Sequence, residues 1–155
     1  YVVLRMGSTG WPDPLRVLST GLLGVNTFVL ICSSLTFALA VESAKRAEIA
    51  KTQRYLLMTA ALGAAFLVIK GFDYVHLWHE GFRLSSNLFG SCYYLLMGFH
   101  ALHVLSGAIF ILYLAGSAGC RGFLTAHAER VEAGGLYWHF IDIVWVILFA
   151  VLCLL

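Results

Sequence analysis

The sequence predicts an all-α fold, a polytopic transmembrane bundle of four helices. Hydrophobic residues make up 61% of the 155 residues and charged residues only 12%, about half the charged share of an average soluble domain. The apolar residues form runs long enough to cross a bilayer, with short polar segments between them. We expect one membrane-embedded domain over residues 1–155, with a loop at 1–14 and spans at about 16–41, 55–79, 88–115 and 132–155.

The composition excludes several classes of function. The net charge of +2 and the lack of basic clusters interleaved with aromatics argue against nucleic acid as a partner. The four cysteines are isolated, so no C-x-x-C pair indicates a metal or redox site. The sequence also lacks G-x-S-x-G, H-E-x-x-H and phosphate-loop motifs. These features favour a membrane protein that supports a larger system over one that turns over a substrate.

The first span follows a turn-rich loop that ends in two prolines, which should delay the start of the helix. Within the span, Ser19, Asn26 and Ser33 recur every seven residues and therefore share one helical face. Small polar residues on one face favour close contact between membrane helices. We expect this face to pack against a neighbouring span.

The second span ends in a cluster of polar side chains at steps of three residues or fewer, so that neighbours can pair along the helix. We interpret the cluster as interfacial charges whose side chains reach toward water, in preference to a proton or ion site. Its members are Lys70, Asp73, His76, His79 and Glu80.

The last span carries a histidine and a carboxylate well inside an apolar run. His139 and Asp142 fall on the same side of the helix as Trp138, Trp145 and Phe149. A charge at this depth is costly unless it faces protein and has a partner. This side of the helix should therefore face the rest of the bundle.

The third span supplies candidate partners, because His100 and His103 lie close to one face of it. Intramembrane polar groups usually pair with one another. We therefore expect His100, His103, His139 and Asp142 to satisfy one another across a helix interface and to fix its register.

Lysines and arginines predict the topology through the positive-inside rule. The segments 42–54 and 116–131 should face the cytoplasm or mitochondrial matrix, which leaves both termini outside, in agreement with an even number of spans. The basic residues of these segments are Lys45, Arg46, Lys51, Arg54, Arg121 and Arg130, against Arg5, Arg16 and Arg83 on the other side, with Lys70 near its interface.

Two hypotheses would use the histidines directly. A di-iron site of the desaturase type needs many histidines at one membrane face, and two i, i+3 pairs with a lone His127 fall short of that set. A bis-histidine haem between His100 or His103 and His139 stays open, because axial histidines have no motif of their own.

Two motifs carry a resemblance to a known family. The run from Gly98 to Val104, G-F-H-A-L-H-V, with Gly107 beyond it, resembles the G-F-H-G-L-H-V…G signature of subunit III of haem–copper terminal oxidases, cytochrome c oxidase subunit 3. The run from Tyr137 to Trp145, Y-W-H-F-I-D-I-V-W, is similar to that family's closing Y-W-H-F-V-D-V-V-W. Shorter similarities occur in the same order at Trp11-Pro12, Asn26-Thr27, Gly71-Phe72-Asp73-Tyr74 and Phe89-Gly90-Ser91.

The resemblance implies a non-catalytic accessory subunit of a respiratory oxidase in the bacterial plasma membrane rather than the mitochondrial inner membrane. Such a subunit binds no haem or copper, packs beside subunits I and II, holds structural phospholipid and helps to sustain proton uptake. It also implies packing and hydrogen-bonding roles for His100, His103, His139 and Asp142, and Glu132 matches an acidic residue before the family's last span.

One departure from the family is that only its last four spans are recognisable. The earlier helices form one wall of the family's lipid cleft. Three explanations stay open: a separate chain supplies them, this chain is trimmed, or this member does without them. A second assignment keeps the fold but places it within a quinol oxidase or nitric oxide reductase complex. A third assignment, from a different class, is a haem- or di-iron-binding membrane oxidoreductase.

Overall fold

The structure is a computed structural model that describes residues 20–79, 88–119 and 123–154. Each of its helices contains a segment long and apolar enough to cross a membrane. The prediction of an all-α bundle with four spans is therefore confirmed for these residues. The helices are α3 (Thr20–Lys45), α4 (Ile49–His79), α5 (Leu88–Ala118) and α6 (Phe123–Leu154).

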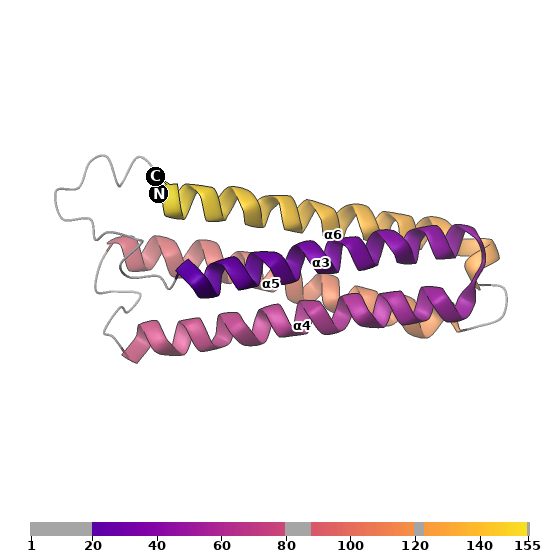
Figure 1. The fold of residues 1–155 in the computed structure, drawn as a ribbon, viewed down its shortest axis with the longest axis horizontal. Helices are drawn as coiled ribbons and strands as arrows, with labels where there is room; N and C mark the ends of the chain where they lie inside the picture. The colour runs from indigo at the N-terminus through magenta and orange to yellow at the C-terminus, as the bar shows by residue number, and fades with distance from the viewer. Residues whose placement is uncertain (1–19, 80–87, 120–122, 155) are drawn as a thin grey trace.

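Successive helices run antiparallel along one elongated bundle (Figure 1). Helices α3 and α5 each pack against both α4 and α6, so α3 faces α5 across a diagonal and α4 faces α6 across the other. The start of α3 and the end of α6 consequently lie at the same end of the bundle (Figure 1).

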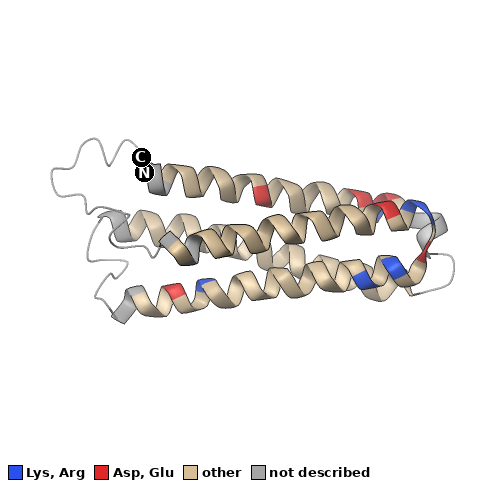
Figure 2. Cartoon of the chain, in the orientation of Figure 1, with Lys and Arg blue, Asp and Glu red and all other residues tan. Residues whose placement is uncertain are grey.

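The helices extend beyond the predicted spans. The predicted loop at 42–54 is helical except for residues 46–48, and the predicted loop at 116–131 is helical from Phe123 onward. An apolar run has the length of the bilayer core, whereas a helix can continue into water through turns that carry charged side chains. Figure 2 shows charged residues gathered at the end of the bundle where α3 joins α4.

A tight turn joins α3 to α4 at Ala47, whose φ of 55° lies in the left-handed region. The amide of Glu48 donates to the carbonyl of Ser43 at 3.0 Å, and the amide of Ala47 donates to the carbonyl of Ala44 at 3.0 Å. These two bonds form a Schellman motif, which satisfies the last carbonyls of α3. The turn is short enough to hold α3 and α4 side by side.

Trp138 of α6 lies at the centre of the packing. Its indole nitrogen donates to Ser33 of α3 at 3.0 Å. A Cβ added at Gly63 of α4 would lie 2.8 Å from the indole, and one added at Gly107 of α5 would lie 3.0 Å from it. Glycine at these positions lets two backbones approach a large aromatic ring. Asn26 and Ser33 are both fully buried, as the seven-residue spacing predicts, while Ser19 lies outside the described residues.

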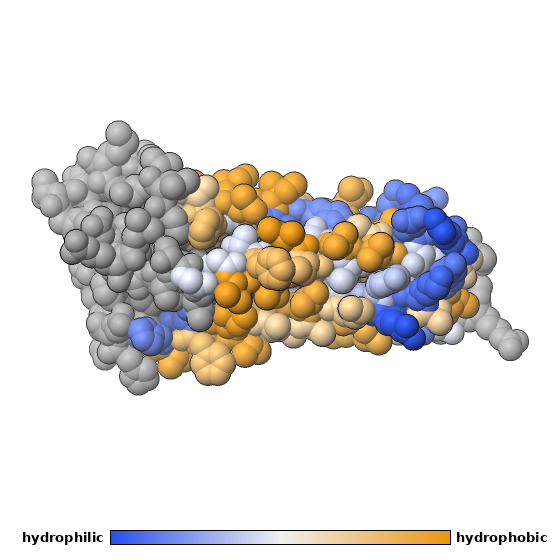
Figure 3. Space-filling view, in the orientation of Figure 1, coloured by the Kyte–Doolittle hydropathy of each residue, from blue (hydrophilic) through white to orange (hydrophobic). Residues whose placement is uncertain are grey.

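The outer surface of the spans is apolar. Figure 3 shows mostly hydrophobic side chains over the middle of the molecule, with a smaller hydrophilic patch among them, and hydrophilic side chains at the α3–α4 turn. Phe28, Phe72 and Leu136 are each about two-thirds exposed or more, at 67%, 71% and 70%. Surface of this kind is suited to lipid or to other membrane proteins.

Candidate functional site

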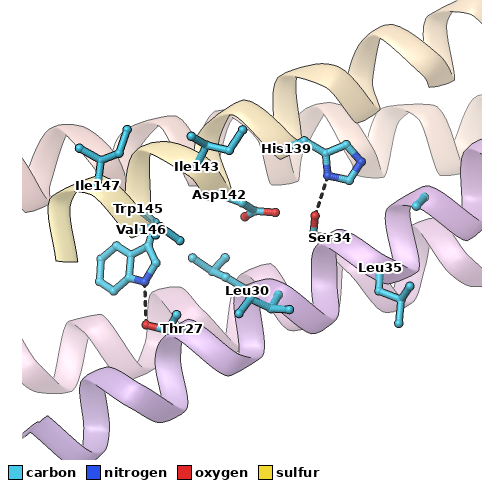
Figure 4. A pocket seen from close by; sticks show the side chains of 12 residues that line it. Thr27, Leu30, Ser34, Leu35, His139, Asp142, Ile143, Trp145, Val146 and Ile147 are labelled. Atoms are coloured by element: carbon cyan, nitrogen blue, oxygen red, sulfur yellow. Dashed lines mark hydrogen bonds between the residues drawn. The ribbon is translucent and has the colours of Figure 1, made fainter. Parts of the chain in front are cut away.

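Hydrogen bonds between α6 and α3 define the polar interface of the bundle. In addition to the bond from Trp138 to Ser33, the indole of Trp145 donates to the hydroxyl of Thr27 at 3.0 Å, and a 2.6 Å bond joins His139 Nδ1 to the hydroxyl of Ser34 (Figure 4). The two indole donors lie on α6 and their hydroxyl acceptors lie on α3, in apolar surroundings. The interface therefore fixes the register of α6 against α3.

Asp142 faces a groove of about 530 Å³ between α3 and α6. The Ser34 hydroxyl lies near this carboxyl (Figure 4), but it bonds His139. Neither Asp142 oxygen has a hydrogen bond of good geometry within the described part of the chain, although both are shielded from solvent. A carboxyl with only the nearby Ser34 hydroxyl beside it is weakly paired, which is costly inside a membrane. The apolar lining of the groove includes Leu30, Ile31, Leu35, Ala38, Ile143, Val146 and Ile147.

The predicted mutual pairing of the four polar residues is wrong. His139 and Asp142 lie on the α3 side of α6, whereas His100 and His103 line a different groove, between α5 and α6. His139 bonds Ser34, and His103 Nδ1 donates to the carbonyl of Phe99 at 2.7 Å. The physical reason is that each histidine has a nearer hydrogen-bonding group: a hydroxyl of α3 lies beside His139, and a backbone carbonyl of α5 lies beside His103.

His100 is buried in an aromatic cluster. Its ring is nearly perpendicular to that of Phe66, with centroids 5.7 Å apart, and is tilted by 36° against that of Trp145 at 5.1 Å. Phe66 and Trp145 are themselves perpendicular at 4.9 Å. His100 is only 4% exposed, and its Nε2 has no hydrogen-bond partner among the described residues.

The interpretation of the polar end of α4 as side chains reaching water is wrong for Lys70 and Asp73. Their side chains are only 4% and 12% exposed and form an ion pair at 3.3 Å. The Lys70 ammonium also lies 4.7 Å from the centre of the Trp145 ring, a cation–π contact. Lys70 turns inward because an acceptor and an aromatic face lie there. His76 is exposed, as expected, whereas the side chain of His79 and the whole of Glu80 lie outside the described residues.

Glu132 takes part in a different interface contact. The Lys45 ammonium of α3 donates to its carboxylate at 3.0 Å, and both side chains are about half exposed. Because the pair is solvated, it contributes little to stability. It does link α3 to α6 at the charged end of the bundle.

The histidines do not form a metal site within the described residues, where no three His, Cys, Asp or Glu side chains are grouped as ligands. The hypothesis of a haem between α5 and α6 requires His139 to face His100 or His103. These side chains line grooves on different sides of α6, so the geometry does not favour that hypothesis. His127 lies in the part of α6 whose side chains are not described.

Thr27 and Ser34 were not among the predicted site residues. The seven-residue spacing that relates Asn26 to Ser33 also relates Thr27 to Ser34, one position further along. That repeat indicates a second row of polar side chains along the same helix. Its partners on α6 are set by the rotation of that helix, which the repeat alone does not fix.

This fold and site define a multi-pass membrane protein whose buried polar groups join helices to one another. Residues 6–154 match the family model described as cytochrome c oxidase subunit III. The chain is 37% identical to the probable cytochrome c oxidase subunit 3 of Nocardia farcinica, over 97% of its length and 74% of the relative's. It is 35% identical to cytochrome c oxidase subunit 3 of Bacillus subtilis, over 100% and 75% of the two lengths. The chain belongs to the cytochrome c oxidase subunit III family and is a subunit of a terminal oxidase.

Proposed function

We propose that the chain is a non-catalytic accessory subunit of a bacterial respiratory haem–copper oxidase. It packs on subunit I, beside subunit II, and contributes neither haem nor copper of its own. The observation that carries this proposal is the use of the polar interior for helix contacts: Trp138, His139 and Trp145 all bond hydroxyls of α3. The apolar outer surface is left for neighbours in the membrane.

The groove between α3 and α6 is the proposed contact for a further membrane-spanning segment, on another chain or an extension of this one. Asp142 needs a hydrogen-bond donor at mid-span, which a protein side chain can supply and an acyl chain cannot. The aligned regions cover 74% and 75% of two relatives, and the remaining quarter of such a protein is long enough for another span. Structural phospholipid would fill the apolar margins of the groove.

Photo-crosslinking distinguishes a protein neighbour from lipid in this groove. A photoreactive residue in place of Ile31, which lines the groove, should crosslink to polypeptide. The same residue in place of Leu102, which is 61% exposed on α5 and lines neither groove, is the control. Crosslinks to lipid alone at Ile31 would reject the proposed protein contact.

The proposed orientation has both ends of the chain outside the bacterial cytoplasm. It is supported by the basic residues around the α3–α4 turn, which would face the cytoplasm. A cysteine placed at Ala47 should react with a membrane-impermeant maleimide only after the cells are permeabilised. Labelling in intact cells would show that the chain has the opposite orientation in the membrane.

Gentle purification of the oxidase tests the accessory role. The chain should copurify with a large subunit that retains all haem and copper, and the isolated chain should have no stoichiometric haem or iron. Removing it should leave the visible spectrum intact but shorten the period of active oxygen consumption, since the proposed role is to sustain proton uptake during turnover. Stoichiometric haem on the isolated chain would contradict the proposal.

A further inference from the structure

We propose that the groove between α5 and α6 binds the head group of a lipid-soluble quinone. The groove has a volume of about 300 Å³ and is lined by His100 and His103 together with Phe99, Phe140 and Val144. This volume is at the lower end of the range of small-molecule sites. The inference concerns this chain alone and goes beyond its proposed role in the oxidase.

His100 supplies the first polar contact. Its side chain is 4% exposed, lines the groove, and has no hydrogen-bond partner for Nε2 among the residues that the structure describes. Phe66 and Trp145 contact the ring on two sides. Nε2 exposes less than 1 Å² of surface, so a ligand in the groove reaches it after a small shift of the ring. A buried nitrogen that lacks a partner favours a ligand that supplies one.

His103 supplies a second polar contact one turn further along α5. Its Nδ1–H donates to the carbonyl of Phe99 at 2.7 Å, so in the neutral ring Nε2 is the acceptor. Its residue number places it about 4.5 Å from His100 along the helix axis. A quinone carbonyl accepts from an imidazole N–H, and the hydroxyl of the reduced quinol donates to an imidazole nitrogen. His103 Nε2 can therefore accept only from the reduced quinol, and a carbonyl of the oxidised quinone would accept from His100 in the tautomer that carries its proton on Nε2.

The depth of the groove argues against a phospholipid head group. His100 is nine residues into the span Ser91–Ala118, or about 13 Å along the axis at 1.5 Å per residue. The span is longer than the hydrocarbon layer, so His100 lies several ångströms inside that layer rather than at its surface. A phosphate at this depth would lose its hydration, whereas a neutral planar head group on a lipid-soluble tail would not.

The shape of the groove argues against a protein helix. His100 lines the groove and is only 4% exposed, so the backbone of a helix about 10 Å across could not approach it, and only a side chain of such a helix could. A flat ring could enter between Phe99 and Phe140, which are 57% and 61% exposed and line the same groove. Their rings would stack on or against a planar ligand.

Fluorescence titration of the full chain in quinone-free lipid nanodiscs tests this site. The probe is a decyl-substituted benzoquinone, and bound quinone should quench the tryptophan emission, because Trp145 touches His100. Quenching should saturate at one quinone per chain. His100→Phe keeps an aromatic ring in the cluster but removes the nitrogen, and it should weaken binding by tenfold or more. Ser106→Ala, which removes an α5–α6 hydrogen bond outside the groove, should change affinity less than twofold.

A second variant keeps the test valid if the His100 substitution disturbs folding. Val144→Phe narrows the groove without removing a polar contact, and it should also weaken binding by tenfold or more. Equal affinity in the wild type and both groove variants would overturn the proposal, as would non-saturable quenching. Displacement of the quinone by excess phosphatidylglycerol would assign the groove to lipid instead. None of these results depends on whether the chain copurifies with an oxidase.

Discussion

The indole of Trp138 donates a hydrogen bond of 3.0 Å to the hydroxyl of Ser33, and both side chains are fully buried. Ser33 in turn donates to the carbonyl of Leu30 at 2.7 Å, so its hydroxyl both accepts and donates. The same indole packs on the glycine backbones of α4 and α5. All four described helices therefore meet at one residue, and changes around it should affect the whole bundle.

Gly63→Ala should destabilise the bundle. The added Cβ would lie 2.8 Å from Cη2 of Trp138, which forces the indole or α4 to move at a cost of about 1–3 kcal/mol. Gly71→Ala is the matched control on the same helix, because nothing lies within 4 Å of its added Cβ, and it should be neutral or stabilise by up to about 1 kcal/mol. Unfolding in mixed detergent micelles measures the free energy of unfolding of both variants. Equal losses of stability would contradict the central place of Trp138 in the packing.

Ser33→Ala should leave the buried Trp138 N–H without an acceptor. Side-chain hydrogen bonds within membrane proteins are worth about 0.6 kcal/mol on average and about 1.7 kcal/mol at most, so a loss toward the upper value is expected at a fully buried site. Ser106→Ala, which removes an exposed bond to Tyr137 of 2.9 Å, is the control and should cost less. The same micelle unfolding compares the two variants, and a larger loss for Ser106→Ala would contradict the ranking.

The sequence was sufficient to predict the four helices but not their ends. Apolar runs of membrane length determine the spans, since any other backbone would leave unpaired amides in lipid. The end of α3 depends instead on a Schellman turn with Ala47 at positive φ, a position usually occupied by glycine. No glycine marks that turn in the sequence. The start of α6 is similarly hidden, because its first turns mix polar and apolar residues and lie before the predicted span.

The depth of His139 and Asp142 predicted that they face protein, and both line the groove between α3 and α6, but their partners were not predictable. A rotation of α6 by a fraction of a turn decides whether its polar groups meet the hydroxyls of α3 or the histidines of α5. That rotation is set by how Trp138 fits against Gly63 and Gly107, a matter of shape that hydropathy does not record. Lys70 is a similar case, since its inward position depends on Trp145, which is distant in the sequence.

Lys70→Met should be strongly destabilising. Asp73, whose side chain is 12% exposed, would lose the cation at 3.3 Å, and breaking a buried pair by removing one partner costs about 3–5 kcal/mol. The double variant Lys70→Met/Asp73→Asn should recover much of that loss, because no uncompensated charge then stays buried. Lys51→Met removes the exposed pair with Glu48 and should cost less than about 1 kcal/mol. A double variant no more stable than Lys70→Met would show that the charge pairing is not the cause.

Asp142→Asn should loosen the proposed attachment to the oxidase core. The carboxyl lies in the α3–α6 groove without a hydrogen-bond partner among the described residues, so its partner is expected on a neighbouring segment. An amide of the same shape changes which groups it can pair with while leaving the apolar packing in place. The fraction of chain that copurifies with the large subunit should fall, with haem content there unchanged, and Glu132→Gln, an exposed change on the same helix, should leave copurification as it is. Full copurification of Asp142→Asn would place the carboxyl outside the assembly interface, and loss of haem from the large subunit would give it a role beyond attachment.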